Sequence, residues 1–514
     1  MLSGLFGKKS DHPMADIKSA QSLLDDLPKN DAYKTLMELT EWIESVSDNT
    51  DFKVDHQFAV LRLLDETAQL YVRKLAREYF TPQELNKFQE NRLWLALGNF
   101  FRHAAHAYCA VLNRYCNGDK GAGAIKAQVP LLAARAVYAM TGQLKYICAR
   151  YGPIDNEIWG NLARIYKHAE QQQYLDTSFA LYSGASENTS VKSEVERLLG
   201  WYGCGVGVLK PLYMHLTERI VARYCSNMDM YSQPNTDSLF SFDLSDPDAP
   251  TRVNVNTVVH SSTRFVSMAA MRPKLEALLK TLEKNTVPED LNFGSVYDAE
   301  LVREAAQHLL DYLSAPPLRR SVRRGVKVNV CVVNSFASVV GITDIGLDFS
   351  DQTPAHWEIE DISASGFRTV LPVQGTDNIR IGSLLGVQPD GVQHWGVAVV
   401  RRLMRDDANR LHVGAEMLAN QIAGVSVSQS GGGGGGFEDG QSALWLEARQ
   451  GESPGETQLL MMKADTFSAN RSLQIRLNKK NYLLIPNKLQ EKGLDYDLAS
   501  FRRIEQETGS EESY

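Results

Sequence analysis

Two short polar segments carry the residue types that bind phosphorylated ligands. The first holds two pairs of arginines, in the order Arg319-Arg320-Ser321-Val322-Arg323-Arg324. A guanidinium is planar and always charged, so it can bind phosphate oxygens through two parallel hydrogen bonds or lie flat on a base. The second segment is Asp361-Ile362-Ser363-Ala364-Ser365-Gly366, which offers a carboxylate, hydroxyls and a glycine that permits a turn or a close approach. Together the segments predict a nucleotide-phosphate site.

The two segments resemble the RxxxR and DxSxxG motifs of the PilZ domain, a bacterial receptor module for the second messenger cyclic di-GMP. The first motif can be read as Arg319 with Arg323 or as Arg320 with Arg324. We favour the first reading, because the family often shows a doubled arginine at the first position. The second reading stays open.

The resemblance implies a role for each matching residue. In the family, the RxxxR arginines wrap the ligand from a segment before the first strand, and the aspartate, serine and glycine of DxSxxG line the guanine on the barrel surface. Carried over by position, the site residues are Arg319, Arg323, Asp361, Ser363 and Gly366, with Arg320 and Arg324 as supporting cations. The separation of the motifs is longer than is usual in the family, which indicates a longer loop around residues 350–354.

The chemistry of cyclic di-GMP suits these residues, since two phosphates need cations and two guanines need flat partners and hydrogen-bonding groups. An interpretation without a ligand site competes with this one. Arginine clusters at a domain entrance are often only solvated charge, and DxSxxG alone is often only a turn. The occurrence of both motifs in order, among predicted strands, favours ligand binding.

Alternating apolar and polar residues predict strands around the motifs. Val326 to Val332, His356 to Ile362, His394 to Arg402 and Leu411 to Met417 read as half-buried strands, and residues 406–409 have turn chemistry. Short strands with turn signals predict a small antiparallel barrel, which is the PilZ-like fold that the resemblance implies over residues 316–427.

The first 230 residues show helical periodicity and predict an all-α domain. The expected helices cover residues 55–80, 83–112, 124–150, 155–172 and 191–202. Trp159-x2-Leu162-Ala163-x2-Tyr166 resembles the first helix of a tetratricopeptide repeat, so a repeat-like region is the alternative to a plain bundle. Residues 231–315 read as a loop or hairpin followed by helices, and Pro316-Pro317 ends them.

Residues 428–441 form a glycine-rich loop or linker, and residues 442–514 form a β-rich extension with an acidic tail that we expect to be frayed. The glycine tract is either a surface loop inside an enlarged β-domain or a tether to a separate β-unit. We favour the loop, because fewer than about 80 residues with few apolar side chains would bury a thin core alone. The overall fold class is therefore multidomain α+β: a helical bundle or repeat-like region, an antiparallel PilZ-like barrel and a β-rich C-terminal extension.

Composition limits the classes of partner. The chain has 514 residues, 43% hydrophobic, which is enough for several domains, and its net charge of −8 argues against general nucleic-acid binding. Its six cysteines show no CxxC pairing and read as reduced core thiols.

The start of the sequence lacks the apolar core of a secretion signal, and no apolar run reaches the roughly 18 residues of a membrane span. We expect a cytoplasmic protein.

The sequence gives weaker support for a metal site, a phosphate loop or a catalytic site. His103, His106 and Cys109 have helical spacing but apolar surroundings, which favours core packing over a metal site. Residues 203–207, Gly-Cys-Gly-Val-Gly, lack the lysine of a phosphate loop and read as a helix break. No set of nucleophile, base and orienting group stands out, so we expect neither an enzyme nor a metal or cofactor other than the ligand.

These observations predict a cyclic di-GMP effector or adaptor in which the barrel binds the messenger and the helical region contacts a protein partner. A PilZ-like scaffold that binds no nucleotide and works only through protein contacts is the alternative. An enzyme with its site in the helical half is a third class, disfavoured by the missing catalytic set.

Overall fold

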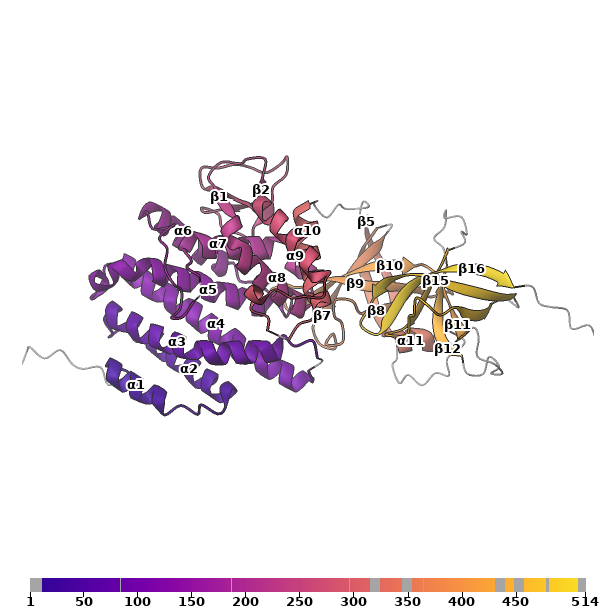
Figure 1. Ribbon diagram of the computed structural model, residues 1–514, viewed down its shortest axis with the longest axis horizontal. Helices are drawn as coiled ribbons and strands as arrows, with labels where there is room; N and C mark the ends of the chain where they lie inside the picture. Colours follow the sequence, from indigo (N-terminus) through magenta and orange to yellow (C-terminus); the bar gives the residue numbers. More distant parts are fainter. Residues whose placement is uncertain are drawn as a thin grey trace, which may run out of the picture. The chain divides into compact units, whose positions relative to one another are not determined.

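The computed structural model describes residues 12–314, 324–343, 354–429, 440–447, 457–477 and 480–506, apart from residues 84, 186, 295 and 364. The chain divides into two compact units, Met1–Pro317 and Leu318–Tyr514 (Figure 1). Each unit is described by itself.

The first unit is mainly helical. Its described α-helices are α1 (Ile17–Asp25), α2 (Ala32–Ser47), α3 (Val54–Tyr79), α4 (Lys87–Cys116), α5 (Val129–Cys148), α6 (Glu157–Gln171), α7 (Val191–Gly203), α8 (Pro211–Tyr224), α9 (Arg272–Leu282) and α10 (Ala299–Ser314). Short 3-10 turns accompany them: η1 (Ala122–Gln128), η2 (Val206–Val208), η3 (Cys225–Asn227), η4 (Ala269–Met271) and η5 (Glu289–Leu291).

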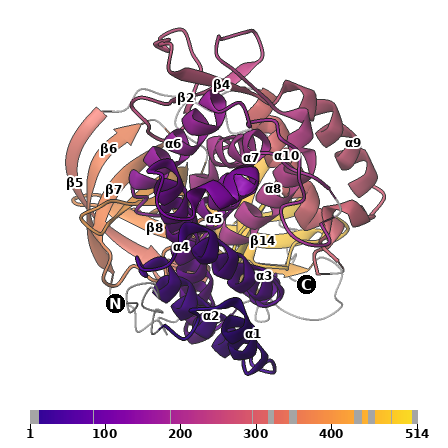
Figure 2. The ribbon, with the colours of Figure 1, turned by 90° about the vertical axis from the view of Figure 1, so that its left-hand side faces the viewer.

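Helix α3 shows why these segments are helical. Its apolar residues recur every three or four positions, and the members of that stripe, among them Phe58, Leu61 and Leu64, are buried. Helix α4 begins at a side-chain cap, since Asn86 accepts a hydrogen bond from the main-chain N–H of Gln89. Helix α4 packs against α2, α3 and α5, and the helices of this unit lie beside one another in Figure 2. The expected helical region is confirmed.

The segment that reads as a loop or hairpin contributes a small antiparallel sheet to the same unit. Its strands are β1 (Asp229–Tyr231), β2 (Ser238–Asp243), β3 (Thr251–Arg252) and β4 (Thr263–Ser267), in the order β1-β4-β2-β3. One continuous core extends from Met14 to Leu309 and includes Phe240 and Phe242 of β2. Residues 231–314 therefore pack into the core of the helical unit.

The second unit contains two closed barrels, each of six described strands (Figure 1). The first has the order β10-β7-β6-β5-β8-β9, with all neighbours antiparallel. Its elements are β5 (Arg324–Asn334), α11 (Phe336–Gly341), β6 (Ala355–Ser363), β7 (Gly366–Pro372), β8 (Leu384–Pro389), β9 (Gly396–Arg405) and β10 (Arg410–Ala419). The expected antiparallel barrel is confirmed.

Strand β5 departs from the expected alternation. Val330 and Val332 are buried as expected, but Val328 is 38% exposed. The pairing with β6 also has a register shift just before this residue, between Gly325 and Val328. The first part of β5, from Arg324 to Asn329, is therefore more exposed than the alternation predicts.

The β-rich C-terminal extension closes into the second barrel, in the order β11-β12-β13-β16-β15-β14. Its strands are β11 (Ile422–Gln429), β12 (Gln441–Leu446), β13 (Thr457–Lys463), β14 (Leu473–Leu477), β15 (Lys480–Lys492) and β16 (Tyr496–Gln506). The expected ranges placed β11 with the first barrel, but its hydrogen-bonded neighbours are β12 and β14. The sequence between β11 and β12 contains the glycine tract, residues 431–436, which lies outside the described residues.

The two barrels share a core. One buried cluster joins Leu384, Val397 and Val399 of the first barrel with Leu444 and Leu498 of the second. Polar contacts lie at the same junction: Arg401 donates two hydrogen bonds to the Glu491 carboxylate at 2.7 and 2.6 Å. A barrel with few apolar residues is stabilised when part of its core lies against a neighbour.

The cysteines differ in exposure, and their reactivity tests the fold. All six are free, and Cys116 is exposed while Cys109, Cys148 and Cys204 are buried. Burial raises the pKa of each buried thiol to about 12. We expect Ellman's reagent to label Cys116 first and the three buried thiols only after unfolding. Retention of the rapid phase in Cys116→Ser would contradict this assignment.

None of the described helices has the length and apolar character needed to cross a membrane.

Candidate nucleotide site on the first barrel

Strand pairing brings the two polar motifs together. Arg324 is the first residue of β5, and its Cα partner on β6 is Ile362. The next residue, Gly325, pairs with Asp361. Arg324 therefore lies opposite the centre of the Asp361-Ile362-Ser363 run, although 36 residues separate them in the sequence. The last arginine of the first motif and the start of the second occupy the same end of neighbouring strands.

Asp361 is held by an arginine that the sequence analysis did not select. Its Oδ2 lies 2.8 Å from Nε of Arg368, and its side chain is 15% exposed. Arg368 also donates a hydrogen bond from Nη2 to Oε2 of Glu360 at 3.0 Å. The antiparallel register pairs Asp361 with Arg368 directly across β6 and β7. A hairpin centred on the DxSxxG turn was the signal that could have pointed to Arg368.

Ser363 and Gly366 close the turn between β6 and β7. The Ser363 hydroxyl donates a hydrogen bond to the Gly366 carbonyl at 3.1 Å, and the two residues are also Cα partners. Gly366 is buried, and a Cβ added to it would lie 2.1 Å from the Ala415 carbonyl oxygen of β10. The close approach at Gly366 is thus to a neighbouring strand, which fixes the turn beside β10.

The arginines of the favoured pair, Arg319 and Arg323, lie outside the described residues, as does Arg320. Of the four arginines, the structure places Arg324, whose side chain is exposed. Beside it, Ile362 is 44% exposed and offers an apolar surface next to a guanidinium. An exposed guanidinium can bind phosphate oxygens or lie on a base, and Ile362 adds apolar contact area beside it.

The weaker candidates form no second site of this kind. Among the described residues, no group of three or more His, Cys, Asp or Glu side chains is arranged to hold a metal ion. His103 lies 3.8 Å from Glu44, His106 is exposed and Cys109 is buried, so these three side chains have different surroundings. Helix α7 ends at Gly203, and Gly205 has a φ of 75°, so residues 203–207 break the helix.

Comparison with known proteins adds a finding on the helical unit. Residues 18–233 match the family model described as "Cyclic-di-GMP receptor FimW, N-terminal domain". The match extends from α1 to just beyond β1, about two fifths of the chain, and does not include the barrels. None of the curated proteins compared with the chain matches it.

Proposed function

We propose that this protein is a cytoplasmic cyclic di-GMP receptor that binds the messenger on its first barrel and passes the signal to a protein partner through its helical unit. The observation that carries the proposal is the register of β5 and β6, which sets Arg324 opposite the Asp361 to Ser363 run. The family match supports the same ligand from a different part of the chain, because it names a cyclic di-GMP receptor and falls on the helical unit. The proposal involves no metal, no further cofactor and no catalytic step.

Each residue has a chemical role in this proposal. Arg319 and Arg323, supported by Arg320 and Arg324, hold the phosphates and cover the bases, since a guanidinium can do both. Asp361 and Ser363 accept and donate hydrogen bonds at a guanine edge, with Gly366 shaping the turn beneath them. Arg368 positions Asp361 through their 2.8 Å contact.

The connection between the units suggests how binding is transmitted. Helix α10 ends at Ser314 and β5 begins at Arg324, so Arg319, Arg320 and Arg323 belong to the segment that joins the helical unit to the barrel. A ligand that binds these arginines at once restricts the conformations of that segment. It therefore shifts the populations of those conformations.

Calorimetric titration of the full chain with cyclic di-GMP tests the proposal. We expect micromolar or tighter binding to the wild type and a loss of at least tenfold in Arg319→Ala/Arg323→Ala and in Asp361→Asn, since hydrogen bonds to charged groups contribute roughly 1.5–3 kcal/mol each. An Arg320→Ala/Arg324→Ala variant decides between the two possible arginine pairs.

Arg410→Ala is the matched control, because Arg410 is an exposed arginine of the same barrel that pairs with Asp406 in its own turn. It should bind like the wild type, and GTP should not compete. Absence of binding to the wild type, or equal binding by every variant, would instead favour the scaffold that uses protein contacts alone.

A further inference from the structure

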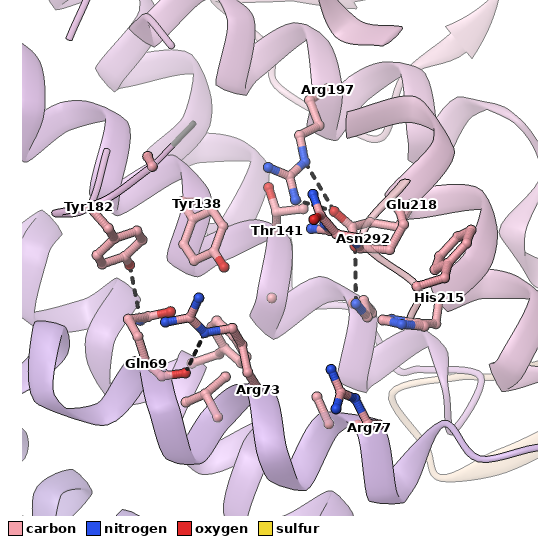
Figure 3. A pocket seen from close by; sticks show the side chains of 18 of the residues that line it. Gln69, Arg73, Arg77, Tyr138, Thr141, Tyr182, Arg197, His215, Glu218 and Asn292 are labelled. Atoms are coloured by element: carbon pink, nitrogen blue, oxygen red, sulfur yellow. Dashed lines mark hydrogen bonds and ion pairs between the residues drawn. The ribbon is translucent and has the colours of Figure 1, made fainter. Parts of the chain in front are cut away.

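The helical unit contains a pocket of about 650 Å³ that neither motif predicts. Helices α3, α5, α7 and α8 and the segment around residues 292–297 line it. Figure 3 shows Arg73 and Arg77 on one side of it and Arg197 and Glu218 on the other. Its volume lies within the range of about 300–1,000 Å³ that is usual for small-molecule sites.

One wall of the pocket is an internally balanced ionic cluster. Glu218 is 3% exposed, and its Oε2 accepts a hydrogen bond from Nζ of Lys145 at 3.1 Å. Its Oε1 accepts from Nε of Arg197 at 3.0 Å. Burial alone would raise the pKa of Glu218, but the charges of Arg197, Lys145 and Arg219 outweigh it and hold that pKa well below its usual value. Arg197 also faces Glu194 at 3.5 Å, so two cations meet two carboxylates here.

Three further cations line the pocket: Arg219, whose charge acts on Glu218, and Arg73 and Arg77, which stand apart from that cluster. Among the described residues, no carboxylate lies within ion-pair distance of Arg73, Arg77 or Arg219. Arg73 donates a hydrogen bond from Nε to the Gln69 main-chain carbonyl at 3.1 Å, which leaves its other N–H groups for another acceptor. Burial and the charge of Lys145 lower the pKa of His215 well below its usual value, so this imidazole adds no charge at neutral pH.

The spacing of two of these cations costs stability in the free protein. Arg73 and Arg77 stand four residues apart on α3, where side chains are neighbours on the helix surface. A like-charge pair at this spacing destabilises a helix by roughly 0.2–0.5 kcal/mol. A bound anion would remove that cost.

Aromatic side chains complete the lining. Tyr138, Tyr182, Phe293 and Tyr297 line the same pocket as the three arginines. Tyr138 and Tyr182 meet edge to face with ring centres 5.5 Å apart. Aromatic rings bind bases by stacking, and arginines bind phosphates through paired N–H groups. The combination fits one ligand that carries both an aromatic base and phosphate.

We propose that this pocket is a second ligand site, which binds a phosphorylated nucleotide with its phosphates at Arg73, Arg77 and Arg219. The site is separate from the barrel, and the proposal does not depend on the barrel binding anything. The chain has a net charge of −8, but this pocket is lined by Arg73, Arg77 and Arg219 and is locally positive, which favours small anions.

The test uses the full chain with the barrel site disabled by Arg319→Ala/Arg323→Ala/Asp361→Asn. GTP, ATP and inorganic pyrophosphate are titrated separately by calorimetry up to millimolar concentration. We expect GTP or ATP to bind more tightly than pyrophosphate, because the aromatic lining adds to the phosphate contacts. Adding Arg73→Gln/Arg77→Gln should weaken that binding at least tenfold.

The matched control is Lys18→Gln/Lys74→Gln in the same background. It also removes two exposed cations from helices of this unit, one of them from α3, and neither lines the pocket. The control should bind nucleotide like its parent. Absence of nucleotide binding, pyrophosphate binding that equals or exceeds nucleotide binding, or nucleotide binding that survives Arg73→Gln/Arg77→Gln would each overturn the proposal. Since the barrel is disabled throughout, none of these results bears on cyclic di-GMP binding there.

Discussion

Arg135→Met should lower the free energy of unfolding of the helical unit by about 3–5 kcal/mol at neutral pH, because it removes one partner from a buried charge network. Arg135 is 1% exposed and donates a hydrogen bond from Nη2 to Glu66 Oε1 at 2.6 Å. Its Nη1 lies 3.5 Å from Asp65 Oδ2, and its guanidinium covers the Tyr182 ring at 4.6 Å. Methionine keeps the apolar stem and leaves the Asp65 carboxylate buried without its cation.

The loss should depend on pH in a defined direction. Burial raises the pKa of Asp65 above its ordinary value of 3.8 even though Arg135 opposes the shift. A carboxyl whose pKa is raised by folding costs stability once the pH exceeds its unfolded pKa, and this cost grows until the folded pKa is passed. Without Arg135 the folded pKa rises further. The deficit of Arg135→Met should therefore be smallest near pH 4 and increase toward pH 7.

Urea denaturation followed by circular dichroism at 222 nm measures this effect, since that signal reports the helices. Arg164→Met is the control, because Arg164 is exposed on α6 and its change should stay within about 0.5 kcal/mol. Adding Asp65→Asn to Arg135→Met should recover part of the loss. Equal losses at pH 4 and pH 7 would show that the charge of Asp65 is not the cause.

Gly366→Ala should destabilise the first barrel by about 3 kcal/mol, the upper part of the range for overpacking. The new Cβ would meet the Ala415 carbonyl oxygen at 2.1 Å, and a main-chain atom of β10 cannot rotate away as a side chain can. Gly325→Ala is the matched control on β5 of the same barrel, because a Cβ there meets no atom within 4 Å.

Thermal unfolding monitored by the near-ultraviolet signal, together with the calorimetric titration, separates stability from binding. We expect Gly366→Ala to melt earlier than Gly325→Ala, and to lose cyclic di-GMP binding through the fold of the turn. A Gly366→Ala protein of wild-type stability would refute the steric argument and return Gly366 to a direct role at the ligand.

The sequence predicted elements with strong periodicity well. The expected helix over residues 55–80 is α3, Val54–Tyr79, because its apolar stripe has one clear period. Strands β7, Gly366–Pro372, and β16, Tyr496–Gln506, were not expected. Gly366 reads as turn chemistry and the end of β16 as an acidic tail, and only pairing with distant strands makes either segment extended.

The candidate sites also contain residues that the sequence could predict and residues that only the fold brings together. The motif residues could be selected because they are close in sequence and match a known spacing. Arg368 could not, since its role follows from the cross-strand register with Asp361. The helical pocket was also missed, because it gathers residues from Gln69 to Tyr297 whose types are ordinary at each position. Only packing shows that Arg73, Arg77 and Arg219, which come from two helices, line the same cavity.

The closure of both barrels limits the free strand edges that the described residues offer to other copies of the chain. An open sheet ends in strands with unpaired N–H and C=O groups, which can recruit strands from other chains and start aggregation. Each described barrel strand has a hydrogen-bonded neighbour on both sides. In the described sheet of the helical unit, the outer strands β1 and β3 have three and two residues, the shortest in it. The described strands thus form much β-structure with few unpaired edges at which a second copy of the chain could add a strand.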